Sequence, residues 1–365
     1  MMFNNINSLP KLFKMIYPET YYGADVDLQC QLAGSISVIL NRRISNPHMR
    51  IEFINFMHQI LPQKNVSSHH EKQNQLYKND FFQNHALKKY LMHALIIVYV
   101  DSEKTDYYGK FSYRYASANI MEYIWSDAQY RQRFIELPTL YPEDFSEFCN
   151  LLINDMNSLL FDGLLALEEI KNYEELREDD ATWQQLPQEE REQSESNFVD
   201  QSRKAKGSLQ LSNMVIQLLA RVTTHCQQPF ISDELGEKFA QAVNFCLDQL
   251  TTQKGLKFKI KDPERYHFEP RPLLTNLITM YSNMAHLEEF KTHVVKDGRS
   301  YSDETFAKAW KIINSTKKNI AVELEHREKF EKLIGELKVL KEAAVEEDVS
   351  TFDILLIHLC FIVII

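Results

Sequence analysis

The run from Phe145 to Tyr173 constrains the fold of this chain more than any other stretch. Apolar residues recur there at steps of three and four, which is the period of one face of an α-helix. They are Phe148, Leu152, Leu159, Leu160, Gly163, Leu167 and Ile170. The spacing therefore predicts one long helix with a buried face.

Composition favours helix in the rest of the chain as well. Only nine Gly and eleven Pro occur in 365 residues, so tight turns are few, and 44% of the residues are apolar, which is ample for a continuous core. We expect an all-α protein. Successive helix pairs joined by short connectors are typical of an elongated α-solenoid, in which each layer buries its face on its neighbour.

The expected solenoid runs from 46 to 345, after a segment, 1–45, that is only partly helical. Asn46 and Pro47 suit the start of a helix that ends at Pro62. The segment 110–134 carries aromatic and apolar residues near one face, and Pro138 and Pro142 are expected to end it. Further helices are expected at 81–103, 209–227, 234–252, 273–284, 303–313 and 319–340.

The run 174–206 is the most charged and least apolar part of the chain, and Pro187 divides it. It predicts a charged helical hairpin. Such a hairpin either contacts a partner or is simply a solvated helix pair supported by its side-chain charges.

The stretch 254–301 differs most from the amphipathic helical pattern of the rest of the chain. In LKFKIK, apolar and Lys residues alternate, which predicts one short extended insertion near 255–262, with Lys257, Lys259 and Lys261 on one face. This face either meets an acidic partner or is a solvated edge. Turns are expected at Asp262-Pro263 and Asp297-Gly298.

Candidate chemistry is sparse. Asp155 and Asp162 lie seven apart, which suits either paired carboxylates or solvated ones, and the adjacent His225 and Cys226 lack the spacing of a metal site. No nucleotide-binding, serine-hydrolase or zinc motif occurs. The sequence therefore assigns no catalytic, cofactor-binding or metal-binding residue, and no cofactor.

Net charge and cysteine content limit the kinds of partner and the cellular compartment that we expect. A net charge of −10 argues against nucleic acid, which needs clustered Lys and Arg. Five widely spaced Cys residues suggest reduced thiols, and no secretory signal is read at the N-terminus. We expect a protein of the cytoplasm or the nucleus.

The C-terminal run 354–365 reads ILLIHLCFIVII, which is shorter than the twenty or so residues of a membrane-spanning helix. It is either a tail anchor of marginal length or the product of a sequence junction or alternative end. We do not expect a membrane partner.

Several separate sequence segments, in the same order along the chain, resemble segments of one protein family. LLINDMNSLLFDGLLALEEI, ATWQQLPQEER, LKFKIKDPERYHFEPRPLL and KDGRSYSDETF, with SNPHMRIEF and YVDSEKTDYYGKFSYRY upstream, resemble the core of the ubiquitin conjugation factor E-four family, the ubiquitin chain-elongation ligases. The resemblance covers about residue 20 to about 345.

This resemblance implies an armadillo-like helical core followed by a U-box, a zinc-free relative of the RING domain that makes the family ubiquitin transferases. The family's U-box recruits a ubiquitin-conjugating enzyme and promotes ubiquitin transfer onto substrates destined for the proteasome, alongside a AAA-type segregase. No covalent intermediate is implied, because the acceleration comes from positioning.

The sequence departs from the family pattern after Asp353. The run 346–365 reads as an acidic linker and an aberrant hydrophobic tail where a U-box would begin. We therefore expect this chain to be inactive alone. The alternative is a non-catalytic helical adaptor or competitor that binds ubiquitylated proteins or a AAA segregase.

Overall fold

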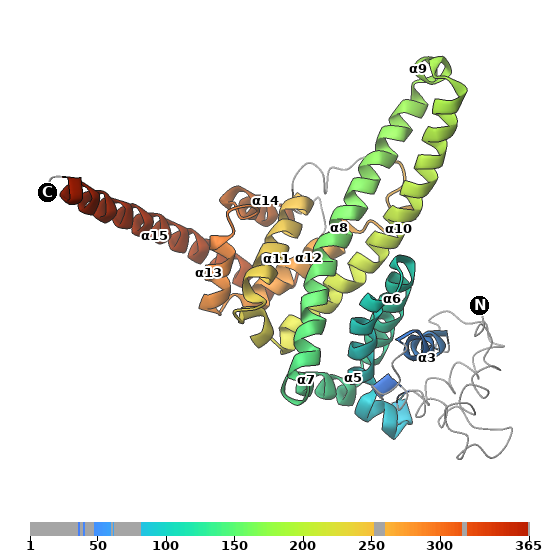
Figure 1. The fold of residues 1–365 in the computed structure, drawn as a ribbon, viewed down its shortest axis with the longest axis horizontal. Coiled ribbons are helices and arrows are strands. Elements are labelled where there is room, and N and C mark those ends of the chain that lie inside the picture. The colour runs from blue at the N-terminus through green and yellow to red at the C-terminus, as the bar shows by residue number, and fades with distance from the viewer. Residues whose placement is uncertain are drawn as a thin grey trace. The chain divides into compact units, whose positions relative to one another are not determined.

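A computed structural model describes residues 36, 39–40, 47–59, 61, 82–251, 260–315 and 320–363 (Figure 1). Within these residues it contains twelve α-helices, short 3₁₀ turns and no strand, which confirms the all-α prediction. The chain divides into two compact units, Met1–Leu151 and Leu152–Ile365. Each unit is described by itself below.

The first unit is built around a helix that is buried along most of its length. This is α5, whose N-cap Asn84 accepts hydrogen bonds from the backbone N–H groups of Ala86 and Leu87. It packs against α3, α6 and α7. The elements are α3 (Pro47–Gln59), α5 (His85–Asp101), η2 (Ser102–Lys104), α6 (Tyr107–Ile124) and α7 (Ala128–Leu140). The predicted start at Pro47 is confirmed.

The structure corrects the prediction for 110–134, which is not one continuous helix. The chain breaks after Ile124, and α7 begins at Ala128 because the Asp127 carboxylate accepts hydrogen bonds from the backbone of Gln129 and Tyr130, at 2.7 and 3.3 Å. Pro138 does not end the segment either. It lies inside the last turn of α7, where the helix continues to Leu140 although Pro138 offers no N–H donor.

Two long helices lie side by side in the second unit and are joined at one end by a short helix (Figure 1). They are α8 (Pro142–Glu178), which starts in the first unit, and α10 (Gln188–His225), with α9 (Asp180–Gln185) between them. Asp162 meets Lys204 at 3.2 Å and the ring of Tyr173 stacks on Phe198 at 4.4 Å, so the two run antiparallel. The predicted long helix over 145–173 and the division at Pro187 are confirmed.

One boundary in this pair was predicted wrongly. The charged run up to 206 and the apolar run from 209 form a single helix, α10, which passes through Gly207 without a break. A helix needs only its own backbone hydrogen bonds to continue, and one exposed Gly costs it about 1 kcal/mol.

Several of the remaining helices of the second unit begin close to the predicted signals. Pro270 opens α12, and Ser302 caps α14 by accepting from the backbone N–H of Thr305 at 3.0 Å. The elements are η3 (Gln228–Ile231), α11 (Gly236–Thr251), η4 (Glu264–Tyr266), α12 (Pro270–Met284), α13 (Glu288–Lys296), α14 (Asp303–Ile313) and α15 (Leu324–Val363).

A fully buried polar network ties three of these elements together. The Asn244 side chain on α11 donates to the Val294 carbonyl at 3.1 Å and to the Asp297 carboxyl group at 3.0 Å. It also accepts from the Tyr281 hydroxyl on α12 at 2.6 Å. Burial, followed by the nearby Cys246, Asp297 and Tyr301, raises the pKa of Tyr281 well above its usual value. The predicted turn at Asp297-Gly298 is therefore anchored to the core.

Some sequence predictions fall outside the described residues. These are most of the segment 1–45, and 255–259 of the predicted extended insertion; its last residues, 260–262, form no strand. Where an acidic linker was expected, the backbone of α15 continues as helix to Val363.

Candidate functional site

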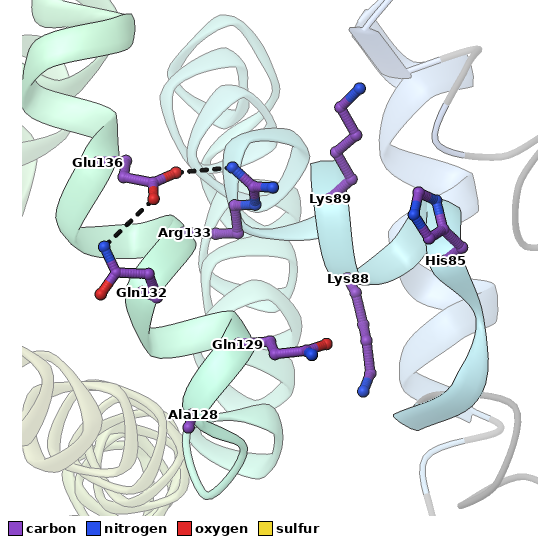
Figure 2. A pocket seen from close by; sticks show the side chains of 8 residues that line it. All are labelled: His85, Lys88, Lys89, Ala128, Gln129, Gln132, Arg133 and Glu136. Atoms are coloured by element: carbon purple, nitrogen blue, oxygen red, sulfur yellow. Dashed lines mark hydrogen bonds and ion pairs between the residues drawn. The ribbon is translucent and has the colours of Figure 1, made fainter.

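An open groove of about 580 Å³ lies between α5 and α7 in the first unit (Figure 2). From α5 come a His and two Lys side chains, and from α7 come polar and charged side chains of its first two and a half turns. The lining residues are His85, Lys88, Lys89, Ala128, Gln129, Gln132, Arg133 and Glu136. Both helices begin at this groove, since His85 and Ala128 are their first residues.

The carboxylates near this groove are already engaged. Glu136 accepts from Gln132 at 3.2 Å and from Arg133 at 2.7 Å, and these hydrogen bonds lower the pKa of the partly exposed Glu136 side chain (Figure 2). Asp127 caps α7, and its second oxygen lies 3.6 Å from Lys88 Nζ. The lining contains three permanent cations, Lys88, Lys89 and Arg133, and one carboxylate, Glu136.

A second open groove, of about 920 Å³, lies between α8 and α11 in the second unit. Phe161 is 43% exposed at this groove, and its ring lies 6.0 Å from that of Phe245. Polar side chains including Asn154 and Asn157 surround the two rings. The groove thus combines an exposed aromatic surface with amide groups.

The outer ends of α8 and α10 form, with α9, a feature that we call the arm, residues 171–204. Its interior is a small aromatic cluster: Trp183 is 4% exposed, Tyr173 meets it edge-on at 6.1 Å, and the Arg177 guanidinium lies 4.4 Å from its ring. Its surface is acidic. The exposed acids are Glu175, Glu178, Asp179, Asp180, Glu189, Glu190, Glu192, Glu195 and Asp200.

The candidate residues read from the sequence do not assemble into a catalytic site. Asp155 is buried, whereas Asp162 is partly exposed and pairs with Lys204. Among the described residues no cluster of three or more His, Cys, Asp or Glu could hold a metal ion, His225 and Cys226 included.

Of the three lysines predicted to share a face, only Lys261 is described. Its ammonium group lies 2.9 Å from Glu178 of the arm, and this hydrogen bond and charge raise the pKa of Lys261. The lysine therefore meets an acidic group of its own chain.

The described cysteines behave as core residues. Cys149, Cys226 and Cys246 are buried free thiols, and burial raises the pKa of Cys226 to about 11. A raised pKa keeps a thiol protonated and unreactive. No described helix is long and apolar enough to cross a membrane.

Comparison with known proteins decides the family. The model of the ubiquitin elongating factor core matches residues 5–338. This chain belongs to that family. The resemblance predicted from the sequence is thereby confirmed; the match begins before the expected residue 20 and ends slightly before the expected residue 345.

Curated relatives from distant organisms support the same family assignment. The chain is 29% identical over 272 residues to the probable ubiquitin conjugation factor E4 of Arabidopsis thaliana, which covers 72% of this chain and 26% of the relative. It is 30% identical over 265 residues to the ubiquitin conjugation factor E4 of Caenorhabditis elegans (72% and 26%) and 29% identical over 282 residues to the E4 ubiquitin-protein ligase of Saccharomyces cerevisiae (75% and 29%). The matched part spans little more than a quarter of each relative.

Proposed function

We propose that this chain is the scaffold of a ubiquitin-protein ligase that elongates ubiquitin chains on substrates for proteasomal degradation, together with a ubiquitin-conjugating enzyme. The observation that carries the proposal is the family match over residues 5–338. One relative is itself named a ubiquitin-protein ligase. We further propose that the helices stack as an armadillo-like α-solenoid, and that the protein acts in the cytoplasm or nucleus.

In this role the chain positions reactants and performs no covalent chemistry of its own. Holding a donor thioester and an acceptor lysine in a productive geometry accounts for a large share of the acceleration in reactions of this kind. The long paired helices α8 and α10 suit such a task, since aromatic and ionic contacts hold the two helices to each other. The partners are thus ubiquitin, ubiquitylated substrates and the conjugating enzyme.

A reconstituted elongation assay tests this role. Activating enzyme, conjugating enzyme and a ubiquitin-fused substrate are combined with the 365-residue chain, with an isolated U-box, or with the chain fused to that U-box. We expect the chain alone to give background elongation and the fusion to exceed the isolated U-box about tenfold, as expected for positioning of both reactants. Elongation by the chain alone, or a fusion no better than the isolated U-box, contradicts the scaffold role.

The acidic arm supports a second candidate function, that of a non-catalytic adaptor for ubiquitylated proteins or a AAA segregase. Its exposed acids offer complementary charge to a basic partner surface. The adaptor function predicts that replacing Glu189, Glu190, Glu192 and Glu195 by Gln weakens capture of a ubiquitylated substrate about tenfold, because charge complementarity is lost.

The matched control neutralises four exposed acids outside the arm, on α15 and just before it: Glu323, Glu325, Glu328 and Glu331. Capture is quantified by pull-down with purified components, at two salt concentrations. Equal capture by the two quadruple variants would dismiss the arm as the contact surface.

A further inference from the structure

We propose that the groove between α5 and α7 binds an acidic peptide segment of a partner protein, one that carries several neighbouring carboxylates. The inference goes beyond chain elongation, because it concerns binding to the first unit and is measured without any ubiquitin transfer. It rests on the charge of the lining, on how that charge is arranged, and on its contrast with the rest of the chain.

Of the three permanent cations in the lining, Lys88 lies near Asp127 and Arg133 pairs with Glu136, whereas Lys89 meets no carboxylate in the part of the chain that the structure describes. Lys89 is exposed, and its ammonium group lies 5.0 Å from the ring centroid of Tyr90. His85 is exposed on the next turn of the same helix. Figure 2 shows Lys88 and Lys89 standing between α7 and His85. An incoming carboxylate would therefore meet donors on both walls.

The backbone adds to this positive field. The amino ends of α5 and α7 both lie at the groove. The neutral Asn84 side chain caps α5 and leaves the partial positive charge of its peptide dipoles in place, whereas the Asp127 carboxylate offsets that of α7. The carboxamides of Gln129 and Gln132 come from the same wall of α7 and provide further N–H donors.

The chain as a whole has a net charge of −10, so it repels acidic partners except where cations gather. A protein carboxylate fits this groove better than a nucleic-acid backbone does. Three permanent cations make a short patch, whereas specific binding to a nucleic acid neutralises many more phosphates.

Fluorescence anisotropy with labelled hexaglutamate tests the proposal on the full chain. The variant Lys89→Glu should lower the affinity about tenfold, because one attractive charge becomes repulsive. Adding Arg133→Ala should lower it further, whereas Lys89→Arg should retain it. Affinity should fall as salt rises. Circular dichroism shows whether each variant is folded.

The matched control is Arg203→Glu, which changes the net charge by the same amount at an exposed site on α10. It should leave binding within about twofold of the original chain, since surface substitutions away from a site have small effects. The proposal is overturned if hexaglutamate does not bind, if Arg203→Glu weakens binding as much as Lys89→Glu does, or if an oligothymidylate of similar charge binds as tightly. The binding of hexaglutamate is measured without ubiquitin transfer, so the failure of this proposal and the failure of the elongation role are distinguishable.

Discussion

Replacing Asn244 with leucine is expected to lower the free energy of unfolding of the second unit by about 2–5 kcal/mol, the cost of leaving two of its three buried hydrogen-bond partners unsatisfied. The side chain is fully buried and makes three hydrogen bonds, at 3.1, 3.0 and 2.6 Å. Leucine has nearly the same size but offers no donor or acceptor. The Tyr281 hydroxyl and one oxygen of Asp297 would then be left without this partner.

Two controls separate the network from general effects of the substitution. Asn157→Leu makes the same change at an exposed position of α8 and should alter stability by no more than about 0.5 kcal/mol. Tyr281→Phe removes a single hydroxyl and should cost about 1–3 kcal/mol. Urea unfolding followed by circular dichroism measures all three. An Asn244→Leu variant as stable as Asn157→Leu would show that the network contributes nothing.

The second large effect is expected at Gly163, where α8 and α10 approach closely. A Cβ atom added there would lie 2.6 Å from both Cγ and Cδ2 of the buried Leu209. Gly163→Ala should therefore destabilise the helix pair by about 1–3 kcal/mol, since overpacking forces neighbouring atoms to shift. Gly207→Ala should do the opposite and stabilise α10 by about 0.5–1 kcal/mol, because an added Cβ meets nothing within 4 Å and Ala favours helix.

Leu209→Ala provides the decisive background. Alone it should cost about 2–5 kcal/mol through lost packing. Once Leu209 is shortened, the contact that opposes a Cβ at position 163 is gone, and Gly163→Ala should become neutral or favourable. Unfolding monitored through intrinsic tryptophan fluorescence and by circular dichroism measures each step of this cycle. Equal effects of Gly163→Ala in the two backgrounds would show that Leu209 does not set the approach.

Local signals predicted the elements that start with a cap or a proline. Pro47, Pro270 and Ser302 act within a few residues of themselves, so their effect can be read directly from the text. The break at Asp127 carried a comparable cap signal. Apolar residues continue on both sides of Asp127, however, so the pattern of 110–134 predicts no interruption there.

The surfaces and the buried network could not be predicted in the same way. Each depends on residues that are distant in sequence: Lys89 and Arg133 line one groove, while Asn244 and Asp297 share one hydrogen bond. No local period encodes such a pairing. The change from charged to apolar residues near 206 likewise does not mark a helix end. It marks where the side chains of α10 become buried, while the helix itself continues.

Because α10 is continuous, the arm holds its tip at a fixed distance from the buried part of α10. Between Gln188 and Ala205, the first buried residue of α10, the helix rises about 25 Å at 1.5 Å per residue. That length approaches the diameter of a small folded domain. A molecule held at α9 would thus stand off from the buried half of α10 by about one domain's width. Lengthening both helices of the arm by whole turns would move it outward in steps of about 5.4 Å, without altering the surface that it contacts.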